Sequence, residues 1–191
     1  MFPGLPPWAG MHPLLVHFPI ALLFITPLFL FLAVLLGRQN HAWALTALLL
    51  LIIGTMGIFA AAASGEAAGK LVERTPEIDA VLERHEHLAE AARGVFSGLT
   101  LGFAALVIVP IALQRELPRW VHVSCYVLFM GFSLGALGFL VQISHQGGRL
   151  VHQFGVHALM GPETPRPPAN QEERHLADRT HRRTPTWIPS D

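Results

Sequence analysis

Four long apolar runs dominate the sequence, and each is long enough to cross a lipid bilayer as one helix. Crossing the hydrocarbon layer takes about 20 apolar residues in helical form. The runs cover residues 14–36, 42–63, 91–113 and 120–143. Only 14% of the residues are charged, whereas a soluble domain carries about 25%. The sequence therefore predicts an all-α integral membrane protein with four transmembrane helices.

The lengths of the links between these runs predict how the helices are threaded. The links after the first and third runs are short, and short links make neighbouring helices antiparallel. We therefore expect an up-down-up-down bundle in a domain covering residues 11–160. Residues 76–90, in the longer middle link, have apolar residues on one side and charges on the other, which predicts a short interfacial helix. Residues 161–191 are polar and proline-rich, and we expect a disordered tail there.

Several classes of function are disfavoured by composition. The chain has 13 basic and 13 acidic residues, so no net charge attracts nucleic acid. Its single cysteine, Cys125, rules out an internal disulfide, a cysteine-based metal cage and covalent haem attachment, which needs two cysteines. No P-loop, dinucleotide fingerprint or nucleophile–base pair is recognisable. We therefore expect a protein without catalytic activity of its own.

Histidines gather at one end of the expected bundle, because alternate helix ends return to the same membrane face. Seven histidines belong to that face: His12, His17, His85, His87, His145, His152 and His157. Only His41 and His122 belong to the opposite face. Neutral imidazole is a common ligand of metals and haem iron, so the cluster predicts a cofactor site. A histidine at headgroup level can also simply bind water or lipid phosphate, an interpretation that suits His12 and His157 best.

Two of these histidines stand at the ends of stripes of small residues. Helical spacing from His87 gives Ala91, Gly94, Gly98 and Gly102. Helical spacing back from His145 gives Gln142, Gly138, Gly135 and Gly131. Such stripes usually indicate close helix packing, and they also leave room for a flat macrocycle.

A b-type haem between His17 and His87 is the favoured interpretation of the cluster. The first and third helices are diagonal in a square bundle, so their side chains can meet across its centre. A bis-histidine haem needs two imidazoles on opposite sides of one iron. His85 and His87 cannot both face inward, because residues two apart point in nearly opposite directions on a helix. His87 is preferred because its face carries the glycines, while His145, His85 and His12 remain candidates.

The same histidines could instead bind a metal ion without haem. Three histidines with Glu66 or Glu86 can bind zinc or copper, although no spacing typical of a metallo-hydrolase helix is present. Glu66 and Gln142 can each hold a ligating histidine through a hydrogen bond. A transition-metal transporter would carry polar groups through the whole bilayer, whereas the middle of each apolar run contains only scattered threonine, serine and cysteine.

Four segments of the chain occur in a recognisable order: HPLLVHFPIAL at 12–22, ASGE at 63–66, HEHLA at 85–89 and GGRLVHQFGV at 147–156. Together they resemble the bacterial membrane domain known as domain of unknown function 2231. The resemblance covers residues 11–157 and implies a four-helix membrane domain without an established activity. His152 departs from the closing motif, where we expect a tyrosine. This departure makes His152 a candidate neighbour of the ligands that is peculiar to this chain.

The resemblance also implies partners, because relatives are joined to Rieske-type or cytochrome c domains. We therefore expect a membrane electron-transfer subunit that binds haem b and meets a redox protein or a larger membrane complex. A non-catalytic anchor or assembly subunit and a transition-metal protein stay open as alternatives. Fused redox domains normally work outside the cytoplasm, so we expect a multi-pass protein of the bacterial inner membrane with both termini on the periplasmic side.

Overall fold

The computed structural model describes residues 6–36, 41–114 and 118–156 of the 191-residue chain. The described part is helical and contains no strand. It comprises a short 3-10 helix and four long α-helices: η1 (Trp8–Met11), α1 (His12–Leu36), α2 (His41–Gly69), α3 (Pro76–Ala112) and α4 (Arg119–His152). All four long helices are apolar enough to cross a membrane. The prediction of an all-helical protein with four such helices is confirmed.

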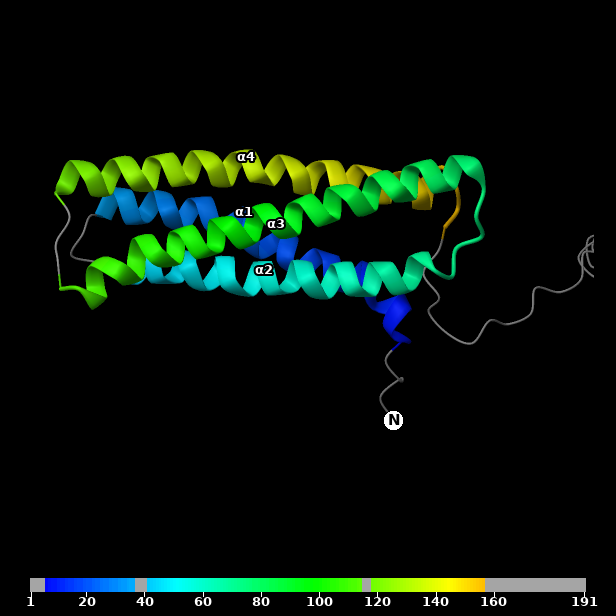
Figure 1. Cartoon of the computed structure of the whole chain (residues 1–191), viewed down its shortest axis with the longest axis horizontal. Helices are drawn as coiled ribbons and strands as arrows, with labels where there is room; N and C mark the ends of the chain where they lie inside the picture. Colours follow the sequence, from blue (N-terminus) through cyan, green and yellow to red (C-terminus); the bar gives the residue numbers. More distant parts are fainter. Residues whose placement is uncertain (1–5, 37–40, 115–117, 157–191) are drawn as a thin grey trace, which may run out of the picture. The chain divides into compact units, whose positions relative to one another are not determined.

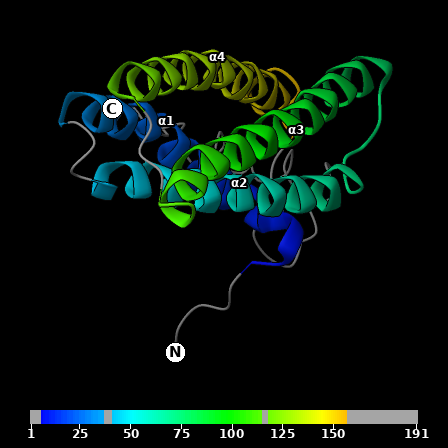
Figure 2. The ribbon, with the colours of Figure 1, turned by 60° about the vertical axis from the view of Figure 1, so that its left-hand side comes forward.

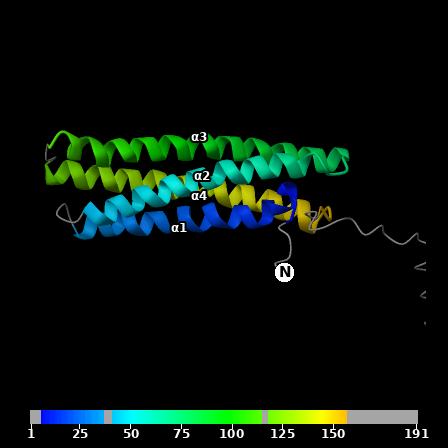
Figure 3. The ribbon, with the colours of Figure 1, turned by 90° about the horizontal axis from the view of Figure 1, so that it is seen from below.

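Each long helix packs against two others, and consecutive helices run in opposite directions (Figure 1). Contacts join α1 with α2, α2 with α3, α3 with α4, and α4 with α1. Among the described residues, no Cα atom of α1 lies within 8 Å of one in α3, and the same holds for α2 and α4. Figure 2 shows α4 lying above α2, and Figure 3 shows α2 beside α1 at one end. Helices α1 and α3 are therefore diagonal in the bundle.

The third helix begins much earlier than its apolar run. Residues 76–90, expected as a separate interfacial helix, are the first part of α3, so the prediction of a separate element is wrong. Local signals start the helix at Pro76: the Thr75 hydroxyl accepts a hydrogen bond from the Ile78 N–H (3.3 Å), and proline suits the first helical position. An apolar run marks where a helix crosses lipid, whereas capping residues mark where the helix starts.

Two other helices also continue past their apolar runs. Helix α2 reaches Gly69 and α4 reaches His152, beyond the ends predicted at residues 63 and 143. Helix α3 has 37 residues, which makes it about 55 Å long, against a hydrocarbon layer of about 30 Å. The helix ends therefore extend past any membrane they cross. The tail predicted for residues 161–191 lies outside the described residues.

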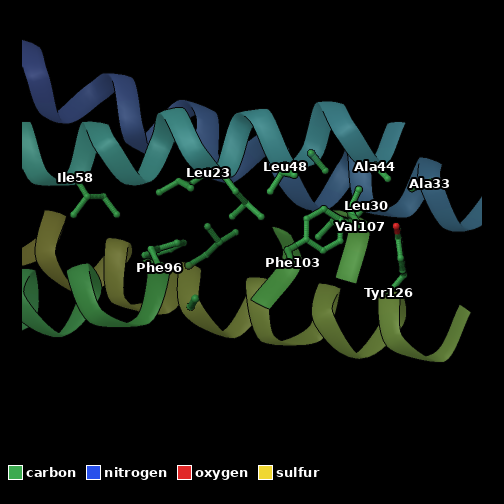
Figure 4. Packing of buried hydrophobic residues seen from close by; sticks show 14 of the residues in the cluster. Leu23, Leu30, Ala33, Ala44, Leu48, Ile58, Phe96, Phe103, Val107 and Tyr126 are labelled. Atoms are coloured by element: carbon green, nitrogen blue, oxygen red, sulfur yellow. The ribbon is translucent and has the colours of Figure 1, made fainter. Parts of the chain in front are cut away.

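Side chains from all four helices form the main core (Figure 4). Leu23 and Leu30 of α1, Leu51 of α2, and Phe96 and Phe103 of α3 are almost completely buried. Between 17% and 44% of the most apolar stretch of each helix is buried inside the chain. The remaining apolar surface faces outward, as it must where lipid is the solvent.

A second, smaller group of buried residues lies where α3 begins and α4 ends. We call it the end cluster, and it consists of Ile78, Val81, Leu82 and Leu150, with Val72, Phe154 and Val156 packed against them. These residues come from the charged segment before the third apolar run and from the residues around the end of α4. The end cluster therefore ties together the helix ends that extend beyond the apolar spans.

Candidate functional site

The rings of His12 and His85 face each other from the two diagonal helices. His12 is the first residue of α1, and His85 lies in the early part of α3. Their ring centroids are 6.4 Å apart and the ring planes are nearly perpendicular, at 84°. Both side chains are partly buried. Two imidazoles thus meet at the end of the bundle that carries the end cluster.

His12 lies against the backbone of α2. Its Nδ1 is 2.9 Å from the carbonyl oxygen of Ala61 and 3.2 Å from the hydroxyl oxygen of Ser64. Ser64 is completely buried and also donates a hydrogen bond to the Ala61 carbonyl (2.8 Å). A Cβ atom added at Gly65 would approach Cε1 of His12 to 2.8 Å. The absence of a side chain at Gly65 therefore lets the ring of His12 rest on α2.

His85 lies against α4 in a similar way. Its Nδ1 is 3.1 Å from the carbonyl oxygen of Ile143. Because a carbonyl oxygen only accepts hydrogen bonds, Nδ1 carries the proton and Nε2 keeps its lone pair. A Cβ atom added at Gly147 would lie 3.4 Å from Cε1 of His85. Glycine again leaves space for a histidine, although less tightly than on α2.

All four segments that carry the family resemblance meet at this point. The first supplies His12, the second Ser64 and Gly65, the third His85, and the last Gly147. We call these five residues the two-histidine site. Its members lie far apart in the sequence, and each long helix contributes at least one of them.

The structure does not bring His17 and His87 together across the bundle. The side chain of His87 is 73% exposed, and its Nε2 lies 3.8 Å from a carboxylate oxygen of Glu83, one turn earlier on α3. His17 is exposed as well, and its Nδ1 forms a hydrogen bond with the Pro13 carbonyl oxygen in its own helix. The prediction that His87 rather than His85 turns inward is wrong. His85 occupies the interior position, and residues two apart cannot share it.

The remaining predicted residues lie outside the two-histidine site. His145, Gln142 and His152 are exposed on α4. Glu66 is exposed and forms an ion pair with Arg93 (3.5 Å). Roles for these four side chains at a cofactor stay predictions. His157 lies outside the described residues.

The glycine stripes of α3 and α4 lie on the outside of the bundle. A Cβ atom added to any of them would meet no atom within 4 Å: Gly94, Gly98, Gly102, Gly131, Gly135 and Gly138. Gly98, Gly131 and Gly135, with Phe129 and Phe139, line an apolar groove of about 440 Å³ between the two helices. The stripes therefore pack against no other part of the described chain. His87 was preferred because its helix face carries these glycines, but that face is the outer surface of α3 and not its interior side.

Sequence reasoning placed His12 at the membrane surface because it precedes the first apolar run. The short helix η1, which packs against α2, leads instead into an α1 that starts at His12 itself. The adjacent small residues Ser64 and Gly65 were a usable signal, because together they leave room for a large ring on that face of α2. The ring pairing itself required the register between α1 and α2, which sequence spacing does not give.

No group of three or more histidine, cysteine, aspartate or glutamate side chains able to hold a metal ion occurs in the described ranges. Protein zinc sites use three or four such ligands. The two-histidine site offers two imidazoles, which is fewer ligands than such a zinc site uses.

A family model described as "Predicted membrane protein (DUF2231)" matches residues 9–159. The match includes every member of the two-histidine site and all four long helices. No curated protein and no solved structure matches the chain.

Proposed function

The chain belongs to the DUF2231 family of predicted membrane proteins, and we propose that it is an electron-transfer subunit that binds a b-type haem between His12 and His85. The observation that carries the proposal is the separation of the two rings, 6.4 Å between centroids on diagonal helices. His12 and His85 lie close enough together that both imidazoles would hold one haem iron, which would supply a one-electron redox centre.

The hydrogen bonds at the site support the same function. A ligating histidine usually donates its other ring N–H to a carbonyl or carboxylate, which orients the ring and leaves the ligating nitrogen free. His85 has this arrangement through the Ile143 carbonyl. His12 can adopt it through the Ala61 carbonyl. Haem bound there would supply a one-electron carrier, while the two helix carbonyls hold its ligands in place.

The position of the site suits exchange of electrons with a partner. The antiparallel order of α1 to α4 implies up-down threading, which gathers the two-histidine site and the end cluster at one membrane face. We place this face on the periplasmic side of a bacterial inner membrane, with both termini there. A Rieske-type or cytochrome c protein, or a larger redox complex, is the partner that such a site would serve.

A second function has support from the same contacts. His12 links α1 to α2, and His85 links α3 to α4, each by a hydrogen bond to a backbone carbonyl. Two such links can serve to hold the bundle together without any cofactor. The protein would then be a non-catalytic anchor or assembly subunit of a larger complex.

Visible spectroscopy separates the two functions. The protein is produced with ample haem, purified in a mild detergent, and measured as a dithionite-reduced minus oxidised spectrum. We expect a b-type α-band that is lost in His12→Ala and in His85→Ala. The band should persist in His17→Ala and His87→Ala, which serve as controls because both histidines are exposed at the same end.

Two results would count against haem. One is a folded protein without Soret absorption at any haem supply. The other is a band that depends on His87 instead of His85. If His12→Ala and His85→Ala lower the melting temperature of a haem-free protein while the exposed controls do not, the anchor function is favoured.

A further inference from the structure

One outward face of α4 changes from apolar to basic where the helix leaves the fourth apolar run. Leu134 and Val141, which are two helical turns apart, are exposed on this face. Steps of four, four and three residues continue the same face to His145, Arg149 and His152. The two histidines are exposed and Arg149 is partly buried. The face that meets lipid chains in the span therefore ends in three side chains that donate hydrogen bonds.

These last three residues, His145, Arg149 and His152, form what we call the α4 stripe, and they lie near the depth of the lipid headgroups. The fourth apolar run ends at residue 143. The helical rise places His145 about 3 Å and Arg149 about 9 Å past this end, and the headgroup layer is about 5–8 Å thick. Side chains on a helix tilt toward its N-terminus, which on α4 is the direction of the bilayer. The Arg149 side chain can therefore reach back to the level of lipid phosphate.

Arg149 carries a positive charge that no carboxylate in the described part of the chain pairs with. Its Nε donates to the side-chain oxygen of Gln153 (3.0 Å), and its Nη1 donates to that of Gln146 (3.2 Å). Both acceptors are neutral amides, and Gln146 is buried, so the guanidinium is held in place with its charge intact. Its remaining N–H groups have no acceptor within the described ranges. The planar guanidinium fork is the group that matches phosphate oxygens.

Arginines near the connection of α2 and α3 are arranged differently. Arg74 is paired with Asp79 (2.8 Å), and Arg93 is paired with Glu66 (3.5 Å). Helix α4, in contrast, contains no aspartate or glutamate along its whole length. The chain therefore supplies an anion to each of these two arginines, whereas the charge of Arg149 stays available to an anion from outside the chain.

We propose that the α4 stripe binds the phosphate of an anionic phospholipid, whose acyl chains lie along Leu134 and Val141. Arg149 supplies a fixed charge and N–H donors, and the rings of His145 and His152 each supply an N–H about one turn away. A zwitterionic headgroup carries a cation beside its phosphate, and a helix without carboxylates offers that cation nothing. The stripe therefore selects a headgroup with net negative charge. This binding is separate from the two-histidine site and does not depend on haem.

Native mass spectrometry of the full chain in a mild detergent tests the proposal. Dioleoyl phosphatidylglycerol and dioleoyl phosphatidylcholine have the same acyl chains and differ in headgroup charge, and each is titrated separately. We expect the phosphatidylglycerol to bind ~5-fold more tightly, which is the effect of one basic side chain at an anionic surface. Arg149→Gln should remove this preference. Arg149→Lys keeps the charge but loses the planar fork, so it should retain part of the preference.

Arg84→Gln is the matched control. Arg84 is exposed on α3 at the same end of the bundle, and the substitution removes the same charge, so the preference for phosphatidylglycerol should stay as it is. Replacing both His145 and His152 by glutamine should weaken phosphatidylglycerol binding about 2-fold, since each ring contributes one exposed hydrogen bond. Circular dichroism compares the folding of the variants. If Arg149→Gln does not fold, Arg149→Lys and the double histidine variant still decide.

Three results would overturn the proposal. The first is equal binding of the two lipids by the unmodified chain. The second is an equal loss of preference in Arg149→Gln and Arg84→Gln, which would assign the preference to overall charge. The third is displacement of the bound lipid by inorganic phosphate, which would assign the α4 stripe to a soluble anion.

Discussion

Three glycines of α2 are packed tightly against α1, whereas the stripe glycines of α3 and α4 face outward. A Cβ atom added at Gly54, Gly57 or Gly65 would lie 2.7, 3.0 or 2.8 Å from the nearest side-chain atom of α1. The same addition to the stripe glycines of α3 and α4 meets nothing within 4 Å. The most apolar stretch is accordingly 44% buried for α2 and only 17% buried for α3.

This difference shows that a stripe of glycines in a membrane helix does not by itself indicate close packing against another helix. On α2 the missing side chains let α1 approach closely along its length, from Leu23 in the core to His12 at the site. On α3 and α4 the missing side chains leave a groove instead. The α1–α2 contact therefore both stabilises the bundle and places one of the two histidines.

The largest effect on stability is expected from Gly54→Ala. The new methyl group would lie 2.7 Å from two atoms of Leu23, and Leu23 is almost completely buried and cannot easily move away. Overpacking of this kind costs about 1–3 kcal/mol. Unfolding in mixed detergent and SDS micelles, followed by tryptophan fluorescence, measures the loss. Unchanged stability would show that α1 does not rest on the glycines of α2.

Gly65→Ala should have a smaller effect on stability but should disturb the site. Its methyl group would lie 2.8 Å from the ring of His12, so the ring must tilt away from the Ala61 carbonyl. Loss of that hydrogen bond costs about 1 kcal/mol. If haem binds as proposed, the α-band should weaken strongly in the reduced minus oxidised spectrum.

Gly147→Ala is the matched control for this change. Its methyl group would lie 3.4 Å from the ring of His85, so a shift of a few tenths of an ångström accommodates it. We expect most of the α-band to remain and stability to change by less than about 0.5 kcal/mol. Equal damage from both substitutions would contradict the tighter packing on α2.

Run lengths and link lengths were enough to predict four helices and to gather histidines at one end. They were not enough to predict which histidines face the interior, because that depends on how each helix is rotated about its axis. The glycine stripe that selected His87 lies on the outer face of α3, while the interior position belongs to His85. A stripe of glycines in the sequence does not show whether another helix of the chain packs against it or whether it stays on the open surface.

His12 was kept as a candidate ligand but was not preferred, for a different reason. It precedes the first apolar run, and hydropathy alone ends the helix region there. In the structure, η1 packs against α2 just before His12. This packing places the His12 ring beside Ser64 and Gly65. Contacts made outside the lipid-spanning stretch are invisible to hydropathy, and the two-histidine site is built largely from such contacts.

The smallest effects are expected from Gly98→Ala and Gly135→Ala, which test the outward-facing half of the comparison. Both methyl groups would enter the open groove between α3 and α4. Alanine is the better helix former by up to about 1 kcal/mol, so stability should stay the same or rise slightly in the unfolding assay used for Gly54→Ala. A loss as large as that of Gly54→Ala would mean that the groove is filled by another molecule in the folded protein. Molecular mass by light scattering, measured for both variants and the unmodified chain, would then distinguish a second protein chain from lipid, because only a lost protein partner lowers the protein mass.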